Sequence, residues 1–290
     1  MYLSKNQRLR ELLARPGIVP AATCYDALSA LIAEKAGFEL IGMGGNGAIA
    51  SELGYPDLEI ATLTEMVEHA RHMAARLRVP MFADADAGYG VVNNLVRTVR
   101  DYENAGVSAI HIEDQLSPKK CGAMDGLRLI DADLMVERIR AAVAARRDPN
   151  FAIIARTDSY KVIGLEECLR RCKMFYEAGA DILMPELIAN IDDLKTVGKL
   201  GADMPLICDI NEPEYNHVTA NDCYEMGFKI CIRSMVPIIG VSRYLEKLFT
   251  YWHENGIPSA ENLITTDDIR YYEKFLRIDE ESELRDRYHF

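Results

Sequence analysis

The sequence contains little that would suit it to nucleic acid, to a membrane or to an oxidising compartment. Basic residues number 33 against 45 acidic ones, and no basic cluster is interleaved with aromatic residues, so we expect no nucleic-acid surface. Nowhere do about eighteen apolar residues follow one another, so we expect no membrane span. The N-terminal stretch "MYLSKNQRLRELLARPG" lacks the apolar core of a signal peptide, and we expect a cytoplasmic protein.

Paired cysteines are also missing. The seven cysteines are an odd number and none lies in a CxxC pair, which argues against a disulfide framework or a structural zinc site. Most are expected to be reduced core residues. One thiol stands apart, because Cys121 follows Lys119 and Lys120 in "EDQLSPKKCGAMDGLRL" (113–129). Lysines beside a thiol are expected to lower its pKa and make it a proton donor or acceptor, and the alternative is a solvated loop with an incidental cysteine.

The chain is rich in short apolar runs that alternate with amphipathic stretches of helical spacing. Eight such repeats predict an α/β fold, a (β/α)₈ TIM barrel rather than an open doubly wound sheet. We expect the barrel to cover residues 1–255 and a helical tail to cover residues 256–290. The tail's apolar residues would pack on a partner subunit or on the barrel itself. The predicted strands lie within residues 17–26, 39–45, 79–88, 108–115, 151–159, 180–187, 204–212 and 228–235.

Acidic residues gather where the predicted strands end. In a barrel these positions meet at one rim, where active sites lie. Any one of these acids is equally well explained as a helix cap. So many like charges at one rim, however, indicate a bound divalent cation. The polar residues at the predicted rim are Asp26, Asp57, Asp84, Asp86, His111, Glu113, Arg156, Asp158, Glu186, Asp209, Glu212 and Arg233.

Three of these acids indicate which metal would bind. Asp84 and Asp86 are two apart in "FADADAGYG", so on a strand both would point the same way, and Glu113 would join them. An all-oxygen ligand set favours Mg²⁺ or Mn²⁺ over zinc, acting on a bound 2-oxo acid or its enolate. Arg156 would clamp a carboxylate, and the backbone of "GMGGNG" (42–47) would receive an anionic group. That glycine pattern is not a dinucleotide fingerprint, which argues against NAD.

Six motifs in order along the chain carry a resemblance to a known family. They are "YDALSA", "LGYPDL", "DADAGYG", "HIEDQLSPKKCG", "ARTDS" and "EAGAD". Together they resemble the isocitrate lyase/phosphoenolpyruvate mutase superfamily, and within it the group of 2-methylisocitrate lyase, dimethylmalate lyase and carboxyphosphonoenolpyruvate phosphonomutase. The resemblance implies a (β/α)₈ barrel, a gating loop over its mouth and a small carboxylic acid substrate. It also implies a homodimer or homotetramer that exchanges C-terminal helices between subunits.

The resemblance further implies roles for individual residues. The metal would be Mg²⁺, held by Asp84 and Asp86 and supported through waters by Asp57 and Glu113. The implied catalytic residues, with the thiol as the acid–base group, are Cys121, Lys120, Arg156, His111 and Glu186. The implied substrate-binding residues are Tyr25, Gly44, Gly45, Asn46, Asp209 and Arg233.

The chain departs from the family pattern in one half of the expected pocket. Ala123 and Leu127 stand where the lyase loop has a histidine and a lysine, and Asp209 stands where the family has asparagine. Arg233 and Ser234 replace a tyrosine–proline pair. We expect Asp209 and Arg233 to pair, because an unpaired buried carboxylate is costly. Unpaired, Asp209 would be free to receive a cationic or hydroxyl-bearing substituent, and Arg233 would be free to bind a carboxylate.

Three functions remain open at this point. The first is a Mg²⁺-dependent carbon–carbon lyase that cleaves an alkylmalate-like 2-hydroxy acid, not isocitrate or methylisocitrate, into a 2-oxo acid and a second carboxylic acid through an enolate. The second is a phosphonopyruvate-type mutase or hydrolase, or an oxaloacetate decarboxylase, on the same metal site. The third is a non-catalytic family member, consistent with the missing loop histidine and lysine. Retention of the metal ligands together with Arg156 and Cys121 favours an enzyme.

Overall fold

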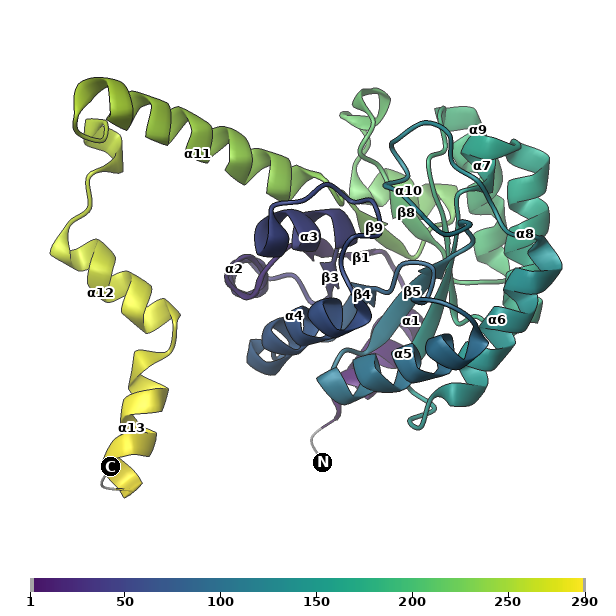
Figure 1. Ribbon diagram of the computed structural model, residues 1–290, viewed down its shortest axis with the longest axis horizontal. Helices are drawn as coiled ribbons and strands as arrows, with labels where there is room; N and C mark the ends of the chain where they lie inside the picture. Colours follow the sequence, from purple (N-terminus) through teal and green to yellow (C-terminus); the bar gives the residue numbers. More distant parts are fainter. Residues whose placement is uncertain (1–2, 289–290) are drawn as a thin grey trace. The chain divides into compact units, whose positions relative to one another are not determined.

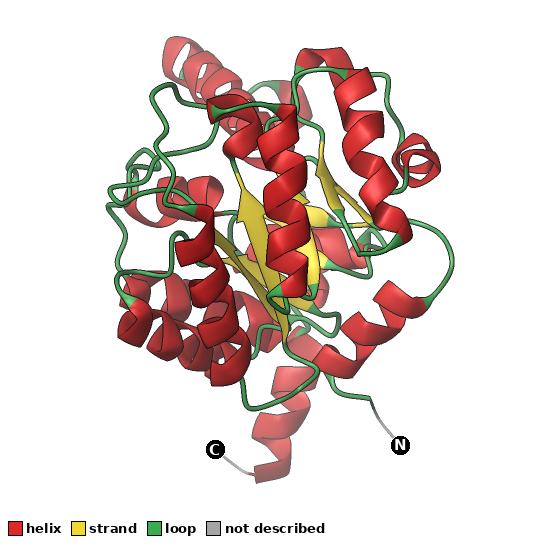
Figure 2. Cartoon of the chain, turned by 90° about the vertical axis from the view of Figure 1, so that its right-hand side faces the viewer, coloured by secondary structure: helices red, strands yellow, loops and turns green. Residues whose placement is uncertain are grey.

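The computed structural model describes residues 3–288, and its centre is a curled sheet of parallel strands surrounded by helices (Figures 1 and 2). Every strand lies inside one of the eight predicted runs, and the first run contains two of them. The strands are β1 (Val19–Pro20), β2 (Ala22–Cys24), β3 (Ile41–Met43), β4 (Met81–Asp84), β5 (Ala109–Glu113), β6 (Ala152–Thr157), β7 (Ile182–Pro185), β8 (Ile207–Asp209) and β9 (Ile230–Ile232).

All pairings between the named strands are parallel, and all but the pairing of β1 with β9 join strands that are consecutive in the chain. Strands β2 to β7 form a six-stranded sheet, and a three-stranded sheet has the order β1-β9-β8. A single parallel bridge between Leu183 and Leu206 connects β7 to the segment before β8. Only Ala21 separates β1 from β2, and its N–H donates to the Cys231 carbonyl at 2.9 Å. The predicted α/β fold with a parallel sheet is therefore confirmed.

The connections between the strands are helices with ordinary terminal signals. Helix α4, for example, begins after Thr62, whose side chain forms a capping box with Glu65. Helix α5 ends at Gly106, which takes the left-handed conformation at φ 88°. The helices are α1 (Lys5–Ala14), α2 (Ala27–Lys35), α3 (Gly45–Leu53), α4 (Leu63–Arg76), α5 (Val92–Ala105), α6 (Ala132–Ala145), α7 (Ser159–Val162), α8 (Leu165–Glu177), α9 (Ile191–Gly198) and α10 (Ala220–Met226).

Alternate strand residues pack on two sides, as the two-residue period of a strand requires. One set, which includes Phe82 and Ile154, forms an inner cluster closed by Leu9 and Leu12 of α1. The other set, which includes Ile153, packs against the surrounding helices. The inner side chains are apolar along the strands. Polar side chains that lie two positions further on, at the strand ends, point the same way and therefore meet in one place.

The chain divides into two compact units, Met1–Ile238 and Ile239–Phe290. The second unit contains most of α11 (Val236–Asn255), followed by α12 (Thr266–Phe275) and α13 (Ile278–Tyr288). None of these three helices contains a buried residue. We had expected the boundary after residue 255, which is the end of α11. Within residues 3–288, no helix combines the length and the apolar character needed to cross a bilayer.

Candidate active site

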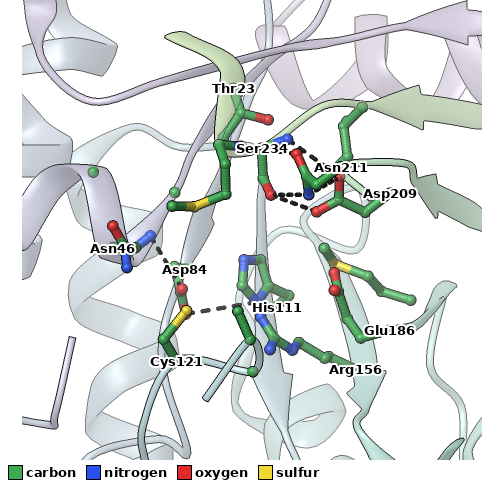
Figure 3. A pocket seen from close by; sticks show the side chains of 18 of the residues that line it. Thr23, Asn46, Asp84, His111, Cys121, Arg156, Glu186, Asp209, Asn211 and Ser234 are labelled. Atoms are coloured by element: carbon green, nitrogen blue, oxygen red, sulfur yellow. Dashed lines mark hydrogen bonds and ion pairs between the residues drawn. The ribbon is translucent and has the colours of Figure 1, made fainter. Parts of the chain in front are cut away.

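A pocket of about 120 Å³ lies at the carboxyl ends of the strands (Figure 3). Its polar wall is made by residues that follow an inner apolar residue by two positions, as Asp84 follows Phe82. The pocket brings together most of the side chains that the sequence predicted. These are Gly44, Gly45, Asn46, Asp57, Asp84, His111, Cys121, Arg156, Glu186 and Asp209.

Asp84 is held in the pocket by two backbone N–H groups. Its Oδ2 accepts the Gly45 N–H at 3.1 Å and its Oδ1 accepts the Asp86 N–H at 2.8 Å. Burial disfavours its ionised form, but the combined influence of His111, Lys119 and Arg156 outweighs burial and lowers the pKa of Asp84 to about 2. A side chain at Gly45 would collide with this carboxylate, so glycine is required where α3 begins.

Asp86 does not continue the alternation of β4. The strand ends at Asp84, and Asp86 has a φ of 48°, so its carboxylate lies behind the pocket, where it pairs with Lys119. Lys119 also donates to Asp57 Oδ1 at 2.7 Å and is only 3% exposed. Burial, reinforced by the charges of Asp84 and Asp57, raises the pKa of Asp86 to about 6 despite the influence of Lys119. Sequence reasoning missed this role of Lys119, because two adjacent lysines give no sign of which one is buried.

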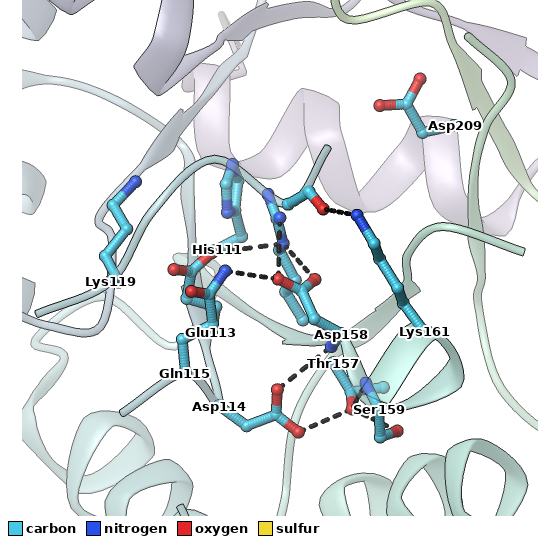
Figure 4. A network of polar contacts seen from close by, with 12 residues as sticks. His111, Glu113, Asp114, Gln115, Lys119, Thr157, Asp158, Ser159, Lys161 and Asp209 are labelled. Carbon is cyan, nitrogen blue, oxygen red and sulfur yellow. Dashed lines mark hydrogen bonds and ion pairs between the residues drawn. The ribbon is translucent and has the colours of Figure 1, made fainter. Parts of the chain in front are cut away.

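Asp158 and Glu113, both labelled in Figure 4, hold Arg156. Its Nε and Nη2 donate to the two oxygens of Asp158 at 3.0 and 3.1 Å, and Nε lies 3.3 Å from Glu113 Oε2. Gln115 donates to the same Asp158 carboxylate at 2.6 Å. Among the described residues nothing accepts a hydrogen bond from Nη1, so this nitrogen is available to a ligand. Gln115 is a positioning residue that the sequence did not reveal.

Cys121 lines the pocket, but its thiol is not activated by the neighbouring lysines. Burial raises the pKa of Cys121, against hydrogen bonds from the Ala123 backbone and the Asn46 side chain. The ammonium of Lys120 donates instead to the Asp125 carbonyl at 2.9 Å and does not line the pocket. The expectation of a lowered pKa was therefore wrong, and the thiol is protonated at neutral pH.

The loop that carries the thiol is held by a residue from another segment. Lys161 of α7 donates to the carbonyls of Gly122, Ala123 and Met124 at 3.1, 2.9 and 2.8 Å. No motif in the sequence pointed to this lysine, since its partners are backbone carbonyls. The contact fixes the position of the Cys121 loop over the strand ends.

The expected ion pair between Asp209 and Arg233 is absent from the described residues. The Arg233 guanidinium donates to the carbonyls of Ile210, Tyr215 and Val218 at 2.9, 3.0 and 2.9 Å. A guanidinium can satisfy several carbonyls at once, and this loop offers three. Arg233 therefore stabilises the loop after β8 and does not line the pocket. The prediction of pairing was wrong.

Asp209 is instead held by polar neighbours at the pocket wall. Asn211 Nδ2 donates to its Oδ1 at 2.6 Å, and the Ser234 N–H donates to the same oxygen at 3.2 Å. The Ser234 hydroxyl donates to Oδ2. Close by, burial raises the pKa of Glu186 well above its usual range, reinforced by Asp209 and opposed by Arg156. Sequence reasoning did not identify Asn211 as part of the site, although it follows Asp209 by two positions.

Besides Lys120 and Arg233, three predicted site residues do not line the pocket. Tyr25 lies outside the pocket wall, and its carbonyl contacts His69 Nε2 at 2.7 Å. Asp86 and Glu113 lie behind the wall rather than on it. Asp86 and Glu113 lie behind Asp84 and Arg156, where they can support the residues of the pocket wall.

The carboxylates fit a hard cation that keeps most of its own water. Apart from the ion pair with Lys119, neither oxygen of Asp86 has a hydrogen-bond partner, and Glu113 Oε1 has none. Within residues 3–288, no group of three or more His, Cys, Asp or Glu side chains is placed to hold a metal ion by itself. One or two carboxylates at the pocket wall would suit Mg²⁺, which is typically held by one or two carboxylates together with waters and substrate oxygens. Zinc would need the closed nitrogen and sulfur ligand set that is missing here.

Comparisons with known proteins identify the family to which the chain belongs. A family model described as phosphoenolpyruvate phosphomutase matches residues 9–237. A 2-methylisocitrate lyase of Aeropyrum pernix is 40% identical over 225 residues, covering 77% of this chain and 72% of the relative. The structure of a 2,3-dimethylmalate lyase superposes with a TM-score of 0.91 at 33% identity, covering 99% of this chain and 96% of that chain.

A third relative was solved with a metal bound. The structure of a phosphonopyruvate hydrolase in complex with oxalate and Mg²⁺ superposes with a TM-score of 0.88 at 26% identity, covering 99% of this chain and 100% of that chain. The family match spans most of the chain, and the relatives cover its length at substantial identity. The chain therefore belongs to the phosphoenolpyruvate mutase/isocitrate lyase superfamily and is an enzyme of that superfamily, in line with its lyase relatives.

Proposed function

We propose that this protein is a Mg²⁺-dependent carbon–carbon lyase that cleaves a small, alkylmalate-like 2-hydroxy acid into a 2-oxo acid and a second carboxylic acid. The observation that carries the proposal is the Cys121 thiol, which lines one pocket together with Asp84 and Arg156 and whose pKa burial raises. A lyase of this kind needs a proton donor for the enolate left by bond cleavage.

Some of the pocket residues bind the substrate, and others transfer protons. Nη1 of Arg156 and the start of α3 at Asn46 bind the carboxylate of the 2-oxo acid half. Burial lowers the pKa of His111, so its ring is neutral, and Nδ1 has no hydrogen-bond partner. His111 accepts the proton of the 2-hydroxyl group as the C2–C3 bond breaks. The electron pair of that bond moves to C3, where the Cys121 thiol supplies the proton.

A metal would be held by Asp84 and Asp57, with Asp86 and Glu113 behind them. Mg²⁺ bound there supplies a Lewis acid that polarises the oxygen of the forming 2-oxo group. Lys119 balances the charge of Asp57 and Asp86 behind the pocket.

The experiment is a screen of the purified protein with Mg²⁺ against dimethylmalate, methylisocitrate, isocitrate, oxaloacetate and phosphonopyruvate, with detection of released 2-oxo acid. We expect turnover of an alkylmalate that stops with EDTA and returns with Mg²⁺. Cys121→Ser should lose at least about a hundredfold in kcat. Full turnover by this variant, or efficient cleavage of methylisocitrate by the wild type, would contradict the proposal.

Hydrolysis of phosphonopyruvate, or decarboxylation of oxaloacetate, is the second candidate function. It is favoured by the small pocket and by Ala123, which replaces the histidine of the lyase loop. The phosphonopyruvate hydrolase structure adds support through its similarity to this chain. In the same screen these reactions would release pyruvate from phosphonopyruvate or oxaloacetate, with no cleavage of any 2-hydroxy acid.

The proposal extends to the architecture and the assembly. We infer that the two sheets belong to one (β/α)₈ barrel in which β1 and β2 are the halves of the first strand.

The helices of the second unit bury none of their described residues and carry large apolar side chains such as Phe249 and Trp252. We infer that they pack on a second copy of the chain, in a homodimer or homotetramer. Light scattering of the full chain and of a variant truncated after residue 238 tests this, and a monomeric full chain would contradict it.

A further inference from the structure

One wall of the pocket is built from hydrogen-bonding groups that the proposed chemistry does not use. It consists of Thr23 from β2, Glu186 after β7, Asp209 at the end of β8, and Ser234 after β9. Figure 3 shows Glu186 and Asp209 on the side of the pocket opposite Asn46. This wall faces the part of the substrate that leaves with the second product.

Asp209 retains acceptor capacity that its neighbours do not fill. A carboxylate has about four lone-pair sites. Asn211 and the Ser234 N–H occupy two of them on Oδ1, and the Ser234 hydroxyl occupies one on Oδ2. One acceptor site therefore remains on Oδ2 for a ligand that donates a hydrogen bond.

Two further groups in this wall lack partners. Glu186 is 7% exposed and its Oε1 makes no hydrogen bond, and Thr23 is 5% exposed and its hydroxyl makes none. A buried polar atom without a partner destabilises the folded state, so these atoms are suited to meet a ligand. Burial, reinforced at Glu186 by the charge of Asp209, raises the pKa of both side chains, so this wall disfavours negative charge and a ligand carboxylate would be unfavourable there.

No cation in this wall is available to neutralise such a carboxylate. Arg233 is committed to three backbone carbonyls behind the wall. Arg156 is fixed by Asp158, and its remaining nitrogen serves the carboxylate of the 2-oxo acid half. The described residues of this wall thus offer acceptors and hydroxyl groups, while Arg156, the cation that acts on Glu186 and Asp209, is already held by Asp158.

We propose that the end of the substrate that faces Asp209 carries a hydrogen-bond donor, a hydroxyl or an ammonium group, and not a second carboxylate. The inference rests on the proposed function for the orientation of the substrate. It makes Asp209 and Ser234 the residues that determine specificity. A site built to hydrogen-bond a substrate group discriminates strongly against analogues that lack it.

Four stable compounds of the same chain length test the inference through binding alone. They are 2,4-dihydroxybutanoate, 4-amino-2-hydroxybutanoate, 2-hydroxybutanoate and malate, each titrated calorimetrically into the full chain with Mg²⁺. We expect the hydroxyl or the amino compound to bind at least about tenfold tighter than both malate and 2-hydroxybutanoate. The tighter of the two identifies the donor group.

Variants then assign the preference to Asp209. Asp209→Asn should weaken binding of the preferred compound by about tenfold and strengthen binding of malate. Asp203→Asn, on the exposed surface, should leave the order of the four affinities unchanged. Circular dichroism and thermal unfolding check that both variants fold. Malate binding as tightly as the donor compounds would overturn the inference, and so would binding of oxalate but of none of the four. Absence of carbon–carbon cleavage, by contrast, would refute the proposed function while leaving the binding order intact.

Discussion

Lys119 donates to Asp57 across 2.7 Å, and both side chains are buried. The same ammonium pairs with Asp86, so one cation serves two carboxylates behind the pocket. A buried ion pair contributes little net stability, but removal of one partner leaves an uncompensated charge.

Lys119→Met should therefore destabilise the protein by about 3–5 kcal/mol, because Asp57 and Asp86 lose their counter-ion. Urea unfolding at neutral pH without added metal measures the change. Lys173→Met, on an exposed helix surface, is the matched control and should stay within about 0.5 kcal/mol. A Lys119 variant as stable as this control would show that the acids do not depend on the ammonium.

The Cys121 thiol should be slow to alkylate. Because burial raises its pKa, the thiolate is scarce, and reaction with iodoacetamide at pH 8 should be about tenfold slower than that of free cysteine. Mass spectrometry of the 113–129 region measures the rate between pH 7 and 10. Steric shielding alone would slow the reaction without moving its pH midpoint, so the midpoint decides the matter. Alkylation at the rate of free cysteine would mean that the loop does not raise the pKa.

Much of the fold could be predicted from the sequence because its signals are local. Each strand lies within a predicted apolar run. The two-residue period of a strand was enough to bring Asp84, Arg156 and Glu186 to one rim. These features depend only on residues close together in the chain.

The remaining features depend on the course of loops and on burial, which local sequence patterns do not predict. The burial of Lys119, rather than Lys120, follows from the course of the 114–131 loop. The failure of Asp209 and Arg233 to pair follows from the loop after β8, whose carbonyls surround the guanidinium. The raised pKa of Cys121 follows from desolvation, which the adjacent lysines could not reveal.

Glu186 should make the folded state less stable as the pH rises. Burial holds its pKa well above that of the unfolded chain, so between these two values the folded state binds more protons and the free energy of unfolding falls with increasing pH. Glu186→Gln resembles the protonated acid and removes this dependence. Relative to wild type, the variant should gain stability between pH 4.5 and pH 7.5 in urea unfolding experiments. The exposed control Glu214→Gln should show no such trend, and a flat difference for Glu186→Gln would mean that Glu186 is ionised in the fold.

Arg233 should act on the loop after β8 and not directly on the substrate. Its guanidinium bonds to three carbonyls, and loss of hydrogen bonds to a charged group costs about 1.5–3 kcal/mol each before compensation by water. Arg233→Ala should lower the free energy of unfolding by about 3 kcal/mol, and Arg233→Lys should recover only part of it, because a lysine cannot reach three acceptors in one plane. Arg243→Ala, in the second unit, is the exposed control and should have little effect. Urea unfolding gives the stabilities, and calorimetry with oxalate and Mg²⁺ gives the ligand affinity. If Arg233→Ala weakened oxalate binding by a hundredfold while stability stayed at the wild-type value, the guanidinium would contact the ligand, and its assignment to the loop would be wrong.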